Sequence, residues 1–93
     1  MIKQVWKFEI TPKQTTLEMP KGAEILTIQL QNEKPCIWAL VNPENAKELR
    51  HFEVYGTGAN INCDIGIERI YRGTFQINNL NMPLVFHLFE RLN

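Results

Sequence analysis

The chain contains no serine, only two cysteines and two histidines, and no apolar run long enough to cross a membrane. The absence of serine excludes every mechanism that uses a serine nucleophile. Cys36 and Cys63 lie far apart, and His51 and His87 are equally isolated, so the sequence predicts no metal site. Without a secretion signal, we expect both thiols to be reduced rather than joined in a disulfide.

Charge of one sign is also missing, because ten basic side chains balance ten acidic ones. Such a chain has no field that could hold a nucleic acid backbone or an anionic membrane, so generic nucleic-acid binding and membrane association are disfavoured. The first ten residues alternate polar and apolar, whereas a signal peptide needs a continuous apolar block. The sequence therefore favours a cytoplasmic location.

The hydrophobic pattern has a period of two over much of the chain, as expected for half-buried strands. Residues 2–10 form the first such segment, with Val5 as an apolar exception on the polar side. The clearest alternation covers residues 24–31, where the predicted inward side chains are Leu26, Ile28 and Leu30. We predict a strand in each segment, with a short extended piece at residues 15–19 between them.

Residues 36–41 are apolar at every position, which predicts a central strand covered on both faces. This segment is expected to form a hairpin with residues 26–31 across four turn residues. Residues 50–56 alternate again, and the pattern places Phe52 and Val54 inward and Arg50 on the polar side or its edge.

Residues 67–77 carry mixed side chains on both faces, and Gly73 in their middle predicts a β-bulge. Residues 78–83 are predicted to be a loop. Residues 84–92 have leucines at helical spacing but are short, rich in aromatics and preceded by proline, so we predict a strand. Together the segments predict one all-β domain over residues 1–93, a small sandwich or barrel of about seven short, mainly antiparallel strands.

The stretch EVYGTGANINCDIG, residues 53–66, is the strongest candidate for a ligand loop. Its GTG is only a fragment of a dinucleotide-binding motif, and no helical pattern or G-K-[ST] follows, so no nucleotide cofactor of that kind is predicted. Glycine and asparagine are first of all turn residues, and a turn is the favoured interpretation. The alternative is a loop whose backbone approaches a ligand closely.

Arg69 and Arg72, beside Tyr71, form the one cluster able to hold a small anion, although a solvated strand edge is the favoured interpretation. If a ligand binds, the predicted residues are Tyr55, Thr57, Asn60, Asn62, Arg69, Tyr71 and Arg72. No catalytic residue is predicted, because nothing local activates Cys63 and no reason favours any two carboxylates as an acid and base pair. The five carboxylates considered are Glu9, Glu18, Asp64, Glu68 and Glu90.

Six blocks cover nearly the whole chain in order: VWKFEI, LEMPKGAEIL, KPCIWALVNPE, FEVYGTG, YRGTFQ and VFHLFE. In this order and spacing the chain resembles a family of small uncharacterised β-rich proteins encoded mainly by tailed bacteriophages and prophages. The resemblance implies a viral origin, a setting in the cytoplasm of an infected bacterium, and no assigned enzymatic activity. One departure is GANINCDIG, where the family more often has a histidine and a proline after GTG.

Three functional hypotheses follow. The first is a non-enzymatic accessory phage protein that acts by binding, either sequestering a nucleotide-type signal of the host or inhibiting a host defence protein. The alternative is a minor virion or assembly component that acts through protein–protein contacts, and the least favoured is a small enzyme. Exposed strand edges and apolar residues such as Val5 on a polar face favour a homo-oligomer.

Overall fold

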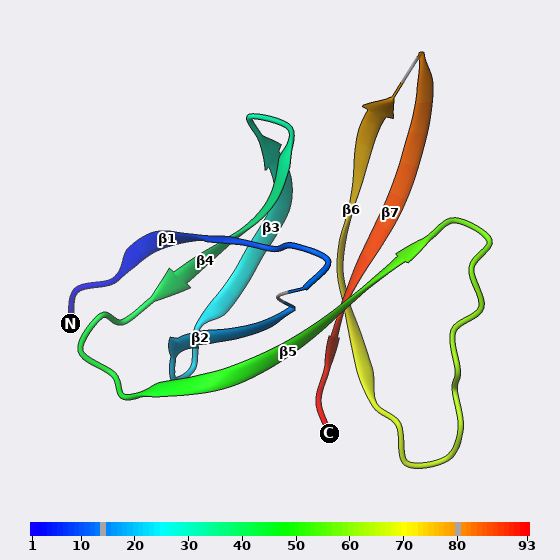
Figure 1. Cartoon of the computed structure of the whole chain (residues 1–93). Coiled ribbons are helices and arrows are strands. Elements are labelled where there is room, and N and C mark those ends of the chain that lie inside the picture. The colour runs from blue at the N-terminus through cyan, green and yellow to red at the C-terminus, as the bar shows by residue number, and fades with distance from the viewer. Residues whose placement is uncertain (14, 80) are drawn as a thin grey trace.

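The computed structural model describes residues 1–13, 15–79 and 81–93, without the side chain of residue 79. This part of the chain forms seven strands and no helix (Figure 1), which confirms the all-β prediction. The strands are β1 (Gln4–Glu9), β2 (Thr16–Pro20), β3 (Glu24–Gln31), β4 (Lys34–Val41), β5 (Lys47–Gly56), β6 (Arg69–Asn79) and β7 (Met82–Arg91). Within the described ranges, no helix offers the length and apolar character needed to cross a membrane.

Two antiparallel sheets make up the fold. One sheet has the order β1-β4-β3 and the other has the order β2-β5-β7-β6. Strand β4 lies in the middle of the first sheet, as its uninterrupted apolar sequence predicts. The outer strands β3 and β6 approach each other, so the two sheets are also in contact along one edge.

The β3–β4 hairpin is confirmed, but its loop is shorter than predicted. Gln31 pairs directly with Lys34, which leaves only Asn32 and Glu33 in the turn. Both have positive φ angles, 52° and 65°, and two such residues give a turn whose twist matches that of the flanking strands. Lys34 and Pro35 therefore belong to the ladder rather than to a four-residue loop.

A bulge in β3 overturns the predicted inward position of Leu26. The register with β4 shifts between Ile25 and Thr27, and the Leu26 side chain is 48% exposed. Ile25 packs against the core instead. One extra residue reverses the side-chain alternation before and after it, which a strict period of two cannot represent.

The predicted bulge in β6 is confirmed, because the register with β7 shifts between Tyr71 and Gly73. The prediction of a strand for residues 84–92 is also confirmed over most of its length. The predicted loop at residues 78–83 is largely wrong, since β6 extends to Asn79 and β7 begins at Met82. Residue 80 of that loop lies outside the described residues.

The core lies between the two sheets. Ile37 and Val41 of the first sheet and Met19 and Leu88 of the second are completely buried. Phe52 is buried as predicted, at 3% exposure. Away from this core, the free ends of the β3–β4 and β6–β7 hairpins stand apart in Figure 1.

Candidate functional site

The outer face of the four-stranded sheet carries a row of aromatic rings from three adjacent strands. Alternation turns Phe52 of β5 and Leu88 of β7 toward the core, so Tyr55 and Phe89 point outward. Phe89 contacts Tyr55 on one side and Tyr71 of β6 on the other, with centroid distances of 6.1 and 5.6 Å in edge-to-face geometry. Tyr71 is 55% exposed. We call these three side chains the aromatic row.

Two arginines lie on one side of the aromatic row, toward the C-terminal end of β7. Arg69 donates from Nε to Glu53 Oε1 and from Nη1 to the backbone oxygen of Asn62, both at 2.5 Å. Its guanidinium carbon lies 5.9 Å from the centroid of the Tyr55 ring, within the range of a cation–π contact. Arg91 Nη1 lies 3.5 Å from the other oxygen of Glu53, and its buried Nε has no hydrogen-bond partner within the described ranges. One carboxylate thus faces two guanidinium groups.

The pKa of Glu53 lies below its ordinary value. Burial by itself raises this pKa, but the hydrogen bonds from Arg69 and Tyr55 and the charges of Arg69 and Arg91 outweigh it. Glu53 is therefore ionised at neutral pH. Since the single negative charge of Glu53 offsets only one of the two arginines, Arg69 and Arg91, this side of the row keeps a positive charge that suits a small anion.

Hydrogen-bonding groups lie on the other side of the aromatic row, two residues before Phe89 along β7. His87 lies between two hydroxyls, with Nε2 2.8 Å from Thr57 Oγ1 and Nδ1 3.0 Å from Thr74 Oγ1. A neutral imidazole has one donor and one acceptor nitrogen, and each threonine hydroxyl can take the complementary role. The Thr74 hydroxyl also hydrogen-bonds the Tyr71 hydroxyl. These contacts hold the Tyr71 ring in place.

In the glycine-rich stretch at residues 53–66, residues 53–56 complete β5, and a tight turn at residues 56–59 follows before an irregular loop. The backbone N–H of Ala59 donates to the carbonyl of Gly56 at 3.0 Å, which closes the turn. Asn62 reaches the site through its carbonyl, which accepts from Arg69, and Asn60 is an exposed residue of the loop. Strand β6 therefore lies beside this stretch, and Arg69 is the predicted ligand residue of β6 that contacts it.

Arg72 lies apart from the other predicted ligand residues. Tyr71 points outward, whereas Arg72 donates from Nε and Nη2 to Oε1 of the buried Glu90, at 3.0 and 2.7 Å. Arg50 donates to both oxygens of Glu90 and, through Nη1, to the carbonyl of Ala23 at 2.9 Å. The predicted position of Arg50 on the polar side of β5 is wrong, because this carboxylate neutralises it inside the fold. Its side chain is 13% exposed.

Both arginines shift the titration of Glu90. Burial raises the pKa of this carboxyl, but hydrogen bonds and charges from Arg50 and Arg72 outweigh burial and hold the pKa below 4.5, its ordinary value. The pKa of Arg50 is raised, chiefly by its hydrogen bond to Glu90. Glu90 and Arg50 are therefore both charged at neutral pH, and we assign the cluster a structural role.

We expect the free energy of unfolding to fall as the pH drops below about 4.5. The folded pKa of Glu90 is depressed, so protons bind more readily to the unfolded chain in this range. The stabilisation is complete above the ordinary pKa and disappears as the pH falls through the folded one. Urea denaturation between about pH 7 and 3 measures this loss. A Glu90→Gln variant should show a shallower pH dependence, and an unchanged slope would contradict the assignment.

The remaining chemical candidates do not come together. Cys36 is buried, Cys63 is exposed and neither forms a disulfide, as the sequence predicts. Among the residues that the structure describes, no three His, Cys, Asp or Glu side chains lie close enough to hold a metal ion. Glu90 is buried, but its partners are arginines rather than a second carboxylate.

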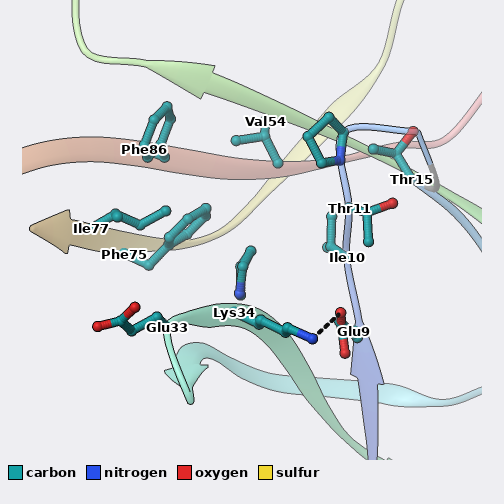
Figure 2. A pocket seen from close by; sticks show the side chains of 12 residues that line it. Glu9, Ile10, Thr11, Thr15, Glu33, Lys34, Val54, Phe75, Ile77 and Phe86 are labelled. Carbon is teal, nitrogen blue, oxygen red and sulfur yellow. Dashed lines mark ion pairs between the residues drawn. The ribbon is translucent and has the colours of Figure 1, made fainter. Parts of the chain in front are cut away.

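A cleft of about 580 Å³ lies between the two sheets on the other side of the molecule. Its walls are mainly apolar, and Figure 2 shows Val54, Phe75 and Phe86 together on the side of the second sheet. Across the opening, Lys34 Nζ pairs with Glu9 Oε1 at 3.9 Å. The cleft offers apolar contact but few groups for chemistry.

Over residues 1–93 the chain matches the model of a family described as a domain of unknown function, DUF7352. The chain belongs to this family. No curated protein and no solved structure matches it. Since the DUF7352 description assigns no activity, the function has to be argued from the geometry of the two surfaces.

Four outer-face residues of this DUF7352 domain are absent from the predicted ligand set: Glu53, His87, Phe89 and Arg91. The last three alternate along β7, so their common face was readable once residues 84–92 were taken as a strand. Their position beside Tyr55 and Tyr71 depends on the pairing of β7 with β5 and β6, which the local sequence does not specify.

Proposed function

We propose that this chain is a non-enzymatic binding protein that holds a small nucleotide-type ligand on the aromatic row. The base stacks on the Tyr71 ring, with Phe89 supporting that ring at its edge, and the phosphate lies toward Arg91 and Arg69. In the cytoplasm of an infected bacterium, the setting that the sequence resemblance implies, such binding sequesters a signalling nucleotide of the host.

The exposed aromatic row is the observation that carries this proposal. Stacking a base on an aromatic side chain contributes about 1–3 kcal/mol and requires no particular base. The Tyr71 ring is 55% exposed, yet its contacts with Phe89 and Thr74 already fix its orientation. A ring held in place before binding loses little conformational entropy when the ligand arrives, which favours affinity.

Charge and size support a small ligand rather than a nucleic acid. Arg69 and Arg91 share one counter-charge, Glu53, and the buried Nε of Arg91 has no partner among the residues that the structure describes. This side of the row therefore has one positive charge left for a phosphate, whereas the chain as a whole has no net charge to hold a long polyanion. On the opposite side of the row, the Thr57 hydroxyl that contacts His87 retains acceptor capacity for a donor of the base or sugar.

Calorimetric titration with a panel of mononucleotides and cyclic dinucleotides tests the proposal. We expect at least one of them to bind the wild type, and Tyr71→Ala to bind it about 5- to 150-fold more weakly, the equivalent of one lost stacking contact. The matched control is Leu49→Ala, which removes another exposed side chain from the same sheet, 61% exposed, and should leave the affinity unchanged. Lack of binding across the panel, or equal affinity for Tyr71→Ala, would reject the proposal.

A further inference from the structure

The end of the β6–β7 hairpin forms an arm with an unusual apolar face. We define the distal arm as residues 74–79 of β6 and residues 82–87 of β7. Phe75 and Phe86 stack across the two strands at a centroid distance of 5.5 Å, and Ile77 lies opposite Leu84. The alternation continues this face to Met82, since it turns every second side chain of β7 the same way.

The inner part of this face packs against the core, where Phe75 is 7% exposed, and its outer part is open to water. Phe75, Ile77 and Phe86 line the cleft. Farther along the arm, Leu84 is 39% exposed and Met82 is 65% exposed. Exposed apolar side chains that continue a partly buried apolar face are the kind of patch that marks an interaction surface.

The whole chain also exposes more surface than a protein of its mass needs to. Its accessible area is 6573 Å² for 10.9 kDa, whereas a monomeric protein of this mass exposes about 5,600 Å². Its radius of gyration is 14.1 Å, against about 12.3 Å for a compact domain of 93 residues. The excess of about 1,000 Å² is close to the roughly 800 Å² that each partner buries in a stable protein–protein interface.

We infer that a second copy of this chain covers the distal arm, with the two arms packed face to face about a two-fold axis. In such a dimer the same patch serves both subunits, which an apolar face satisfies without matching charges. Two copies with no net charge do not repel each other over long range.

The edge of the sheet favours the same partner. Strand β6 is the outer strand, and its residues 74–79 in the distal arm include no charged residue and no proline, the residues that commonly block the approach of another chain. Nearer the core, a bulge between Tyr71 and Gly73 bends this edge and the strand approaches β3, so the open part of the edge lies in the distal arm. This dimer uses the inner face of the sheet, so it stands or falls independently of ligand binding on the outer face.

Sedimentation equilibrium tests the dimer at about 100 µM, well above a micromolar dissociation constant. We expect twice the chain mass of 10.9 kDa for the wild type. Leu84→Lys places like charges against each other across the axis and should weaken association at least about 100-fold. Leu49→Lys, an exposed position on the outer face, is the matched control and should remain a dimer.

Circular dichroism establishes that each variant is folded. If Leu84→Lys fails to fold, Met82→Lys replaces it, because Met82 is more exposed and contributes less to the core. A monomeric wild type at this concentration overturns the inference, as does a folded lysine variant that still dimerises. A wild type that purifies as a monomer with an apolar small molecule or a foreign polypeptide in the cleft overturns it as well.

Discussion

Replacing Glu90 with alanine is expected to lower the free energy of unfolding by roughly 3–5 kcal/mol. The Glu90 side chain is 4% exposed and accepts hydrogen bonds from Arg50 and Arg72. Its removal leaves Arg72 without this counter-charge and Arg50 with only Glu48, whose Oε2 lies 4.0 Å from Nη1, and that penalty exceeds the loss of the pair itself. Urea denaturation monitored by tryptophan fluorescence gives the difference.

A matched control removes a carboxylate from an exposed ion pair. Glu9→Ala breaks the contact with Lys34. Because the Glu9 side chain is 44% exposed and that of Lys34 is 66% exposed, the free energy of unfolding should fall by only about 0–1 kcal/mol. Replacing Glu90, Arg50 and Arg72 together by apolar residues of similar volume should cost much less than Glu90→Ala alone, because no buried charge remains. Similar losses for Glu90→Ala and Glu9→Ala would contradict the arrangement.

Gly73→Ala should destabilise the fold by roughly 2–5 kcal/mol, which combines steric overlap with backbone strain. A Cβ atom at this position would lie 2.6 Å from Cγ2 of Ile28, and the φ angle of Gly73 is 153°. Gly73 sits at the bulge where β6 meets β3, so neither strand can move aside without disturbing the contact between the sheets.

Two further variants separate the clash from the strain. Gly22 has a φ angle of 80° and open space around its missing Cβ, so Gly22→Ala reports strain alone, about 1–2 kcal/mol. In an Ile28→Ala background the overlap is gone, and Gly73→Ala should cost at least about 1 kcal/mol less than in the wild type. Additive effects of Gly73→Ala and Ile28→Ala would show that the two positions are not in contact.

Much of the fold could be predicted because its strands are half-buried and alternate. The central position of β4 followed from its apolar sequence, and the bulge in β6 followed from a lone glycine between mixed faces. The bulge in β3 has no such marker. Nothing in residues 24–31 distinguishes Leu26 as the extra residue, and only its pairing with β4 does so.

Arg50 shows a different limit of sequence-based prediction. A charged side chain within an alternating strand is normally solvated, and the polar side was the reasonable assignment. Its counter-charge, Glu90, lies 40 residues away in a strand that only the sheet brings close. Residue type predicts burial well for apolar side chains. The burial of a charged side chain depends on partners that the local sequence does not reveal.

The candidate site was predicted in part. Tyr55, Arg69 and Tyr71 do lie on one face, because β5 and β6 flank β7. Arg72 follows Tyr71 directly and therefore points to the opposite face of the sheet. The prediction of one cluster from Arg69, Tyr71 and Arg72 did not take this alternation into account. Phe89, which joins the two tyrosines, comes from the segment whose secondary structure was hardest to assign.

Native mass spectrometry of the protein purified from the cells that produce it tests the central claim most directly. We expect the intact protein to carry an adduct in the mass range of a nucleotide, which denaturation releases and which Tyr71→Ala, purified in the same way, lacks. A wild-type protein without any adduct, or an adduct that Tyr71→Ala retains equally, would contradict binding at the aromatic row.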